Sequence, residues 1–253
     1  NSKLIEIIFT MKSNKIKFIL GLQSFATQDS GACLLRLSVD GTVLDYVAIS
    51  EERLIRKKYP YTFPVHSIAY CMRHYELESM NQVDLVVGDH IRAKRWFNSG
   101  PAYPTSEYDY LKLKFDVDPA KIIVISHHMA HAASTYYSSG FEESAILIVD
   151  GNGSDLQTTS FLYGSGNSIE YLSTYKGHGI GAVYAAVTHE VLNLGTGGEG
   201  KTMGLAPYGE PKYVNLIKDN LIDIKKDGSF RLNQDYFNYT TGLSMTNEKF
   251  HNL

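Results

Sequence analysis

Short apolar segments separated by polar turns fill residues 16–50. The segment IKFILGL (16–22) is apolar and rich in β-branched residues, and the polar stretch QSFATQDSG separates it from ACLLRLSV (32–39). Asp40-Gly41 is a typical hairpin signal, and TVLDYVAIS (42–50) follows it. The pattern therefore predicts three consecutive strands with a polar loop between the first two.

The next hundred residues alternate between helical and strand-like patterns. Val65, Ile68, Ala69, Met72 and Tyr75 have the spacing of one helix face, which predicts a helix within 63–77. VDLVVGD (83–89) and KIIVIS (121–126) predict short buried strands. The second of these leads directly into HHMAHAASTYYSSG, a predicted helix that Gly140 can end.

The strand–polar loop–strand pattern then occurs a second time. SAILIVDGNGSD (144–155) is an apolar strand with a glycine-rich acidic turn, so the pattern of 18–36 is repeated at 145–163 with different residues. We predict two subdomains, 14–143 and 144–253. Later predicted elements are two strands within 157–176, helices over 181–195 and 213–224, and a turn at Asp227-Gly228.

Composition narrows the class of protein. The 253 residues are 43% hydrophobic and 20% charged, which is typical of a soluble globular protein. A net charge of -3 and a pI of about 6.3 argue against nucleic-acid and membrane-surface partners. The two cysteines argue against a disulfide framework and favour a reducing cytoplasm. The run 18–22 is too short for a signal peptide, so we interpret it as a strand and residues 1–13 as a loose leader.

The segment GTGGEGKTMGLAPYG (195–209) contains a match to a phosphate-binding motif. Gly195–Thr202 fits the P-loop template G-x-x-x-x-G-K-[ST]. A P-loop needs a strand before it and a helix after it, because loop amides and the helix N-terminus together hold the phosphates. Here a helical pattern precedes the motif, and Pro207 with nearby glycines argues against a sustained helix after it. We predict an irregular loop over 197–204, in which Lys201 is not a P-loop lysine.

Two interpretations of this loop remain open. In the first, a helix ends and an irregular turn follows, with Glu199 and Lys201 in solvent. In the second, glycines allow the backbone to approach a nucleotide closely. The second interpretation makes Gly198, Glu199, Gly200 and Lys201 candidate cofactor-binding residues.

The strongest chemical signal lies in SHHMAHAAS (126–134). His127 and His131 are four residues apart, so in a helix they lie on one face and can bind one metal ion. His128 and His131 are a second possible pair. Histidines at a helix start or in a core are the ordinary alternative, because H-x-x-x-H alone is a weak match.

Asp150 strengthens the metal interpretation. It ends the strand AILIVD, and His127 lies just beyond the strand KIIVIS. Ligands of open α/β sheets gather at the carboxyl ends of strands, and two imidazoles with a carboxylate suit iron, zinc or manganese. Open coordination positions could then accept substrate oxygens. The alternative for Asp150 is a turn-forming role in DGNGSD.

Five motifs together resemble the carbamoyltransferase family of nodulation and antibiotic-tailoring enzymes. They are ILGLQSFATQDSGACLL, EERLIRKK, SHHMAHAAS, ILIVDGNGSD and GEGKTMGLAPYG, in the family's order across residues 17–210. The resemblance implies an α/β fold of the duplicated actin, hexokinase and Hsp70 type (ASKHA), with an incomplete second half. Each half of that fold opens with a strand, a phosphate loop and a strand, which makes Gly151 and Gly153 further candidates for nucleotide binding.

The resemblance also implies a reaction. A C-terminal adenylate-forming domain makes carbamoyl adenylate from carbamoyl phosphate and ATP, and the N-terminal domain transfers the carbamoyl group to a small-molecule hydroxyl. The family's metal pattern, H-x-x-x-H followed by an aspartate, maps onto His127, His131 and Asp150. A further carboxylate ligand of the family is expected beyond the region that this chain covers.

One position departs from the family pattern. The first loop usually reads His-Asp-Ser, and here it reads Gln28-Asp29-Ser30. Glutamine cannot serve as an acid or base, which leaves Asp29 as the candidate catalytic residue. Two other hypotheses remain: a small-molecule kinase of the same superfamily, which does not explain the histidine pair, and a metal- and nucleotide-binding domain without independent catalysis.

Overall fold

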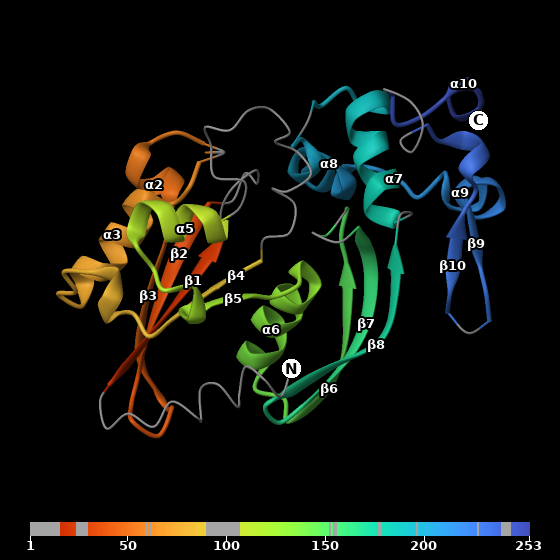
Figure 1. Cartoon of the computed structure of the whole chain (residues 1–253). Helices are drawn as coiled ribbons and strands as arrows, with labels where there is room; N and C mark the ends of the chain where they lie inside the picture. Colours follow the sequence, from red (N-terminus) through yellow and green to blue (C-terminus); the bar gives the residue numbers. More distant parts are fainter. Residues whose placement is uncertain are drawn as a thin grey trace. The chain divides into compact units, whose positions relative to one another are not determined.

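A computed structural model of the chain (Figure 1) describes residues 16–23, 30–58, 60, 62–89, 107–151, 153, 156–176, 179–195, 197–226, 228–238 and 244–253. Its contacts divide the chain into two compact units. One consists of Asn1–Ser144 and Tyr163–Glu170, and the other of Ala145–Leu162 and Tyr171–Leu253. The division into domains 14–143 and 144–253 stays a prediction.

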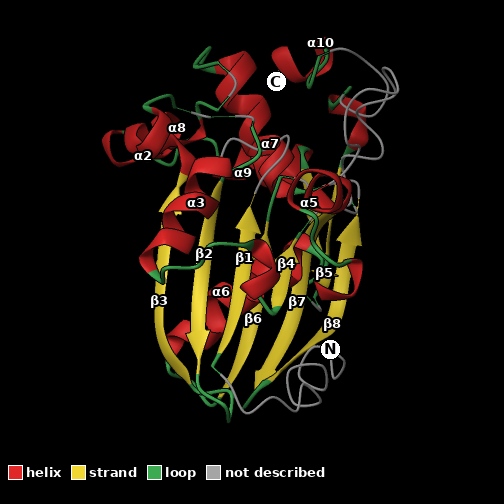
Figure 2. Cartoon of the chain, turned by 60° about the vertical axis from the view of Figure 1, so that its left-hand side comes forward, coloured by secondary structure: helices red, strands yellow, loops and turns green. Residues whose placement is uncertain are grey.

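The first unit is built on a mixed five-stranded sheet in the order β3-β2-β1-β4-β5 (Figure 2). Its strands are β1 (Lys17–Gln23), β2 (Gly31–Leu37), β3 (Val43–Ser50), β4 (Leu85–Gly88) and β5 (Ile122–Val124). β2 pairs antiparallel with both β1 and β3, whereas β1, β4 and β5 are parallel. The five strands predicted in this region are confirmed. The parallel strands bring their carboxyl ends to one edge of the sheet, where Asp89 and His127 follow β4 and β5.

The helices of this unit include the two that were predicted and several that were not. They are α2 (Glu51–Ile55), α3 (Val65–His74), the 3-10 turns η1 (Met80–Gln82) and η2 (Pro119–Lys121), α5 (Glu107–Phe115), and α6 (His127–Ser139). α6 begins at an N-cap, Ser126, whose hydroxyl accepts from the Met129 amide at 3.2 Å. It ends at Gly140, where a φ of 75° suits glycine, as predicted. α3 and α6 are the predicted helices, whereas α2 and α5 were not predicted.

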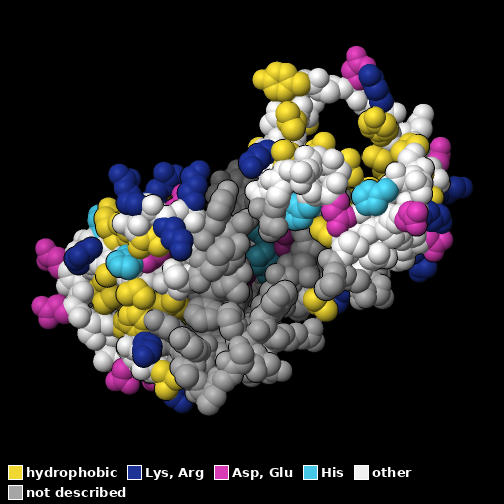
Figure 3. All heavy atoms as spheres, turned by 90° about the horizontal axis from the view of Figure 1, so that it is seen from above, with side chains coloured by type: hydrophobic (Ala, Val, Ile, Leu, Met, Phe, Trp, Pro, Cys, Tyr) yellow, Lys and Arg dark blue, Asp and Glu magenta, His cyan; other side chains and the backbone are white. Residues whose placement is uncertain are grey.

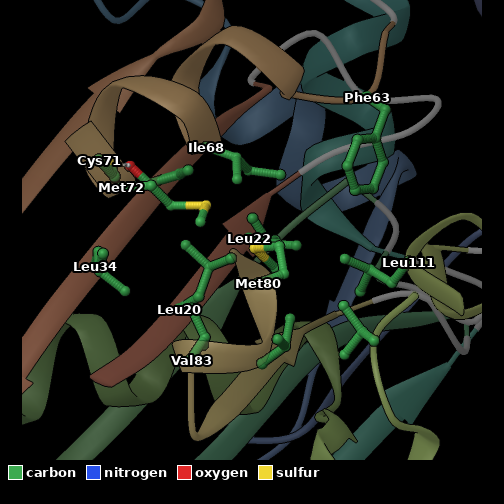
Figure 4. Close-up of a cluster of buried hydrophobic side chains, with 13 residues drawn as sticks. Leu20, Leu22, Leu34, Phe63, Ile68, Cys71, Met72, Met80, Val83 and Leu111 are labelled. Atoms are coloured by element: carbon green, nitrogen blue, oxygen red, sulfur yellow. Dashed lines mark hydrogen bonds between the residues drawn. The ribbon is translucent and has the colours of Figure 1, made fainter. Parts of the chain in front are cut away.

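Apolar side chains at alternate positions of the strands form the core of the first unit. Leu20, Leu22 and Leu34 point to the sheet face that α3 covers, and Ile68 and Met72 of α3 pack on them (Figure 4). This burial is the main stabilising contribution, at about 1.5–3 kcal/mol for each large side chain. The other face of β1 and β2 carries small residues such as Gly21, Gly31 and Cys33.

The second unit contains most of a three-stranded sheet and several short helices. The strands β6 (Glu143–Val149), β7 (Gln157–Ser165) and β8 (Ser168–Lys176) are neighbours in that order. The second strand–loop–strand pattern is therefore confirmed. The remaining elements are α7 (Ile180–Ala186), a π-helix η3 (Val187–Val191), α8 (Glu199–Leu205), η4 (Ala206–Tyr208), α9 (Val214–Asn220), β9 (Ile222–Ile224), β10 (Phe230–Leu232), η5 (Gln234–Tyr236) and α10 (Glu248–His251).

The prediction of an irregular loop over 197–204 is wrong. Residues 199–205 form α8, which continues into a 3-10 turn that contains Pro207. Two turns of helix fit before the proline because most of these residues are good helix formers, and each internal glycine costs only about 1 kcal/mol. The segment before the motif is helical and not a strand, as predicted, so the P-loop context is absent from residues 180–205.

Two further helix predictions need correction. The helix predicted over 181–195 changes to a π-helix after Ala186 and ends at Val191. The helix predicted over 213–224 ends at Asn220, and residues 222–224 pair with β10 instead. Leu221 is buried against Leu232 and Tyr236, and this tertiary packing outweighs the local helical pattern.

The surfaces of the two units differ in character. Arg53, Lys57 and Lys58 lie exposed in and after α2, and basic side chains gather on this unit in Figure 3. In the second unit Tyr208 is 90% exposed, and apolar side chains of the α8–α9 region protrude there. None of the helices in the described ranges has the length and apolarity needed to cross a bilayer.

Candidate metal centre and nucleotide loop

The predicted histidine pair converges at the start of α6. The Nε2 atoms of His127 and His131 lie 2.9 Å apart, and their rings are nearly perpendicular, at 88°. Two nitrogens that each bind one ion at about 2.1 Å and subtend a right angle lie about 3 Å apart. The pair therefore has the separation of two ligands on one metal ion. His128 is fully buried, so the alternative pair of His128 and His131 is disfavoured.

A residue that the sequence analysis missed completes this arrangement. Asp89 follows β4 at the same sheet edge, and its Oδ2 atom contacts Nδ1 of His127. Only 8% of Asp89 is exposed. Metal-binding histidines commonly bond a carboxylate through their second nitrogen. The rule that singled out Asp150, a carboxylate at the end of an apolar strand, could have found Asp89 in VDLVVGD.

Asp150 lies in the second unit, directly after β6. Its Oδ1 atom accepts from the Gly151 amide at 2.6 Å, and its own amide donates to the Thr158 carbonyl at 2.9 Å. At Gly181, in α7, a Cβ atom would come within 2.7 Å of the Asp150 carbonyl oxygen, so glycine permits this close approach. Because the histidines belong to the first unit, the joint ligand set stays a prediction.

The other predicted site residues are only partly described. Gly153 follows Asp150 and Gly151 in the β6–β7 turn, and its amide donates to the Gln157 carbonyl at 2.6 Å. Asp29 and Gln28 lie outside the described residues. The catalytic role of Asp29 and the nucleotide-binding role of Gly151 and Gly153 therefore stay predictions.

The candidate nucleotide-binding residues 198–201 form the first turn of α8 and its cap. Glu199 Oε1 lies 2.9 Å from Nε2 of His189, and Lys201 Nζ lies 3.5 Å from the Leu194 carbonyl oxygen. The first contact joins α8 to the π-helix that precedes it, and the second joins α8 to the segment between the two helices. They give Glu199 and Lys201 intramolecular partners, and their roles toward a nucleotide stay predictions.

Side chains of the π-helix contact different segments of the second unit. The Thr188 hydroxyl lies 2.8 Å from that of Thr202 in α8, while the Glu190 carboxylate accepts from the amides of Met245 and Thr246. Burial acts to raise the pKa of Glu190, but the hydrogen bonds from Thr246 and Met245 outweigh it and lower the pKa. π-helical turns are frequent at functional sites, and this one ties together three segments of the second unit.

Alanine substitutions at Gly198, the N-cap of α8, and at Gly200, within α8, should change the free energy of unfolding in opposite directions. A Cβ atom on Gly198 would lie 2.7 Å from the Leu194 carbonyl oxygen, whereas one on Gly200 meets nothing within 4 Å. Gly198→Ala should therefore lower the free energy of unfolding by about 1–3 kcal/mol through overpacking. Gly200→Ala should raise it by about 0.5–1 kcal/mol through helix propensity. Urea unfolding of the matched pair tests this, and equal effects would contradict the packing assigned to Gly198.

The first unit also contains a cavity of about 690 Å³ at the carboxyl edge of its sheet. Its lining combines small and apolar residues with two charged ones: Gly21, Leu22, Gly31, Cys33, Ile49, Arg53, Val87, Asp89, Ile125 and Ala130 are among them. Pockets for small ligands commonly have 300–1,000 Å³ and a mostly apolar lining. Burial raises the pKa of Cys33, so this thiol stays protonated at neutral pH and is a poor nucleophile.

Comparisons with known proteins agree with the family suggested by the motifs. The family model for the carbamoyltransferase N-terminus matches residues 105–253. An uncharacterised Synechocystis protein is 38% identical over 93% of this chain and 42% of its own length. The nodulation protein NolNO of Sinorhizobium fredii is 29% identical over 85% of this chain and 33% of its own length. The nodulation protein NolO of Bradyrhizobium diazoefficiens is 32% identical over 44% of this chain and 20% of its length.

The chain belongs to the carbamoyltransferase family, in its N-terminal region. The predicted family is thereby confirmed. The chain spans about two fifths or less of the length of these relatives.

Proposed function

We propose that this chain acts as the N-terminal part of an O-carbamoyltransferase. In this proposal it accepts carbamoyl adenylate, made from carbamoyl phosphate and ATP by a C-terminal adenylate-forming domain, and transfers the carbamoyl group to a small-molecule hydroxyl. The acceptor oxygen bonds to the carbamoyl carbon, the bond from that carbon to the phosphate oxygen breaks, and AMP leaves. The acceptor's proton passes to a base, for which Asp29 is the candidate.

The observation that carries the proposal is the convergence of His127 and His131 in a chain of this family. Their Nε2 atoms are 2.9 Å apart. In this proposal a carboxylate oxygen of Asp150 joins the two nitrogens, and two imidazoles with a carboxylate suit iron, zinc or manganese. A divalent ion held there would polarise the carbamoyl oxygen as a Lewis acid.

The fold proposed for this function is the duplicated ASKHA type. Each of two segments opens with a strand, a polar loop and a neighbouring strand, β1–β2 and β6–β7. The first sheet has the order β3-β2-β1-β4-β5 and three parallel members. In this proposal the β6–β7 turn, with Gly151 and Gly153, and the start of α8, with Gly198–Lys201, contact the nucleotide.

Isotope transfer tests the reaction and separates it from the alternatives. The chain is incubated with a divalent metal, a set of hydroxyl compounds, and carbamoyl adenylate labelled with ¹⁴C in the carbamoyl group. A parallel reaction contains ATP labelled with ³²P at the γ-phosphate. We expect ¹⁴C in an acceptor and release of AMP, both lost in His131→Ala. Transfer of ³²P would indicate a kinase, and binding without either transfer would indicate a domain without independent catalysis.

A further inference from the structure

We propose that Asp89 is a positioning residue that fixes the tautomer of His127, whereas His131 changes tautomer when a metal ion binds. This inference rests on the metal-binding part of the proposed function. In the metal-free chain, Nε2 of His127 then already has a lone pair available for the ion. His131 must first move its proton from Nε2 to Nδ1.

Backbone hydrogen bonds between β4 and β5 fix the position of Asp89 relative to His127. Gly88 pairs with Val124 in the parallel ladder of β4 and β5, and the Ile125 amide donates to the Gly88 carbonyl at 2.9 Å. Asp89 and His127 therefore continue from two strand ends that hydrogen bonds hold together. Asp89 is buried, which strengthens its interaction with the imidazole because little water screens it.

Hydrogen-bond chemistry then determines the tautomer of His127. An ionised carboxylate can only accept, so the contact between Asp89 Oδ2 and His127 Nδ1 requires a proton on Nδ1. A neutral imidazole with its proton on Nδ1 has a lone pair on Nε2. That lone pair is directed away from Asp89 and is the one a metal ion would use.

The same reasoning assigns the opposite tautomer to His131. Its Nε2 atom lies 2.9 Å from Nε2 of His127, which is hydrogen-bond distance. When the His127 ring is neutral, its Nε2 carries no proton, and His131 Nε2 must then donate in this bond. When an ion binds both Nε2 atoms, the His131 proton must leave Nε2, and the neutral ring then carries its proton on Nδ1. The number of protons on the two rings is unchanged.

Nitrogen NMR of histidine-labelled chain tests both tautomers directly. Without metal, we expect a protonated Nδ1 on His127 and a protonated Nε2 on His131. Adding Zn²⁺ should leave the His127 proton in place and move that of His131 to Nδ1. A His127 ring that is protonated on Nε2 in the metal-free wild type, or an unchanged His131 tautomer in the zinc-bound form, would overturn the proposal.

Cobalt binding supplies a second readout with a matched control. Loss of such an outer partner commonly weakens metal affinity 10- to 100-fold, so Asp89→Ala should raise the Kd for Co²⁺ by about that factor. Asp89→Asn keeps the size of the side chain but removes its charge, and we expect it to raise the Kd for Co²⁺ about 10-fold. This variant replaces Asp89→Ala in the test if the alanine variant does not fold. Asp84→Asn is the control, because Asp84 is equally buried, at 8% exposed, but accepts from the Phe18 amide.

The role of Asp89 and the carbamoyl transfer reaction can fail independently in these experiments. Wild-type Co²⁺ affinity in a folded Asp89→Asn chain, or no Co²⁺ binding by the wild type, would overturn the role of Asp89. A chain with the expected tautomers and Co²⁺ affinities that transfers no carbamoyl group would support the role of Asp89. The same result would reject the proposed function.

Discussion

Replacing His131 with alanine should remove most of the metal that the chain takes up. Its Nε2 atom is 2.9 Å from that of His127, so the variant loses one of two converging ligands. Loss of an outer partner alone costs about 10–100-fold in affinity, and loss of a direct ligand should cost at least 100-fold, as an order of magnitude. Elemental analysis after dialysis against Zn²⁺ or Mn²⁺ measures the effect.

The matched control for this variant is His74→Asn. His74 is a histidine of the same unit at the end of α3, and its side chain is 46% exposed near Asp45. It should take up metal as the wild type does. Undiminished metal content in folded His131→Ala would reject the assignment of the pair, and an equal loss in His74→Asn would point to nonspecific surface binding.

The largest expected effect on stability is that of Glu51→Ala. Glu51 begins α2 and is 1% exposed. Its carboxylate accepts from the amide and hydroxyl of Ser67, at 2.7 and 2.6 Å, and from the His66 amide at 3.1 Å. These amides lie in the first turn of α3, where the N-cap, Pro64, makes no side-chain hydrogen bond. Glu51 therefore caps a helix that begins fourteen positions after it in the sequence.

Alanine at this position leaves buried donors without an acceptor. We expect the free energy of unfolding to fall by about 3 kcal/mol, as for other broken buried polar networks. Glu52→Ala is the control, because Glu52 is the next residue and makes only a 3.7 Å contact with the exposed Arg53. That change should cost less than about 0.5 kcal/mol. Similar urea midpoints for the two variants would contradict the capping role.

The same carboxylate should make stability fall in acid. Burial acts to raise the pKa of Glu51, but the hydrogen bonds from Ser67 and His66 outweigh it and lower the pKa. A lowered folded-state pKa gives a contribution that is complete above the ordinary value of about 4.3 and is lost as the pH falls through the lowered value. Thermal unfolding between pH 7 and pH 3 should therefore be less pH-dependent in Glu51→Gln than in wild type.

Local patterns account for much of what could be predicted here. Apolar strands with polar turns predicted β1–β3 and β6–β8, because alternation and turn residues act over a few positions. Ser126 and Gly140 mark the ends of α6, and the spacing of His127 and His131 places both on one face once that helix exists. The family followed from several short motifs in a common order.

Long-range contacts account for what could not be predicted. α8 forms although Gly200 and Gly204 lie within it, and the contact of Glu199 with His189 supports it from outside. Residues 222–224 extend as a strand because β10 pairs with them. In both places partners from elsewhere in the chain outweigh weak local preferences.

The sequence by itself therefore determined strands β1–β8, the helix that carries the histidine pair, and the family. These depend on interactions within a few residues or on the order of motifs. Only the tertiary structure decided that Asp89 meets His127 across 38 positions and that Glu51 caps α3. Such contacts depend on which strand ends share a sheet edge and which helix starts are left uncapped. That information arises only when distant segments pack together.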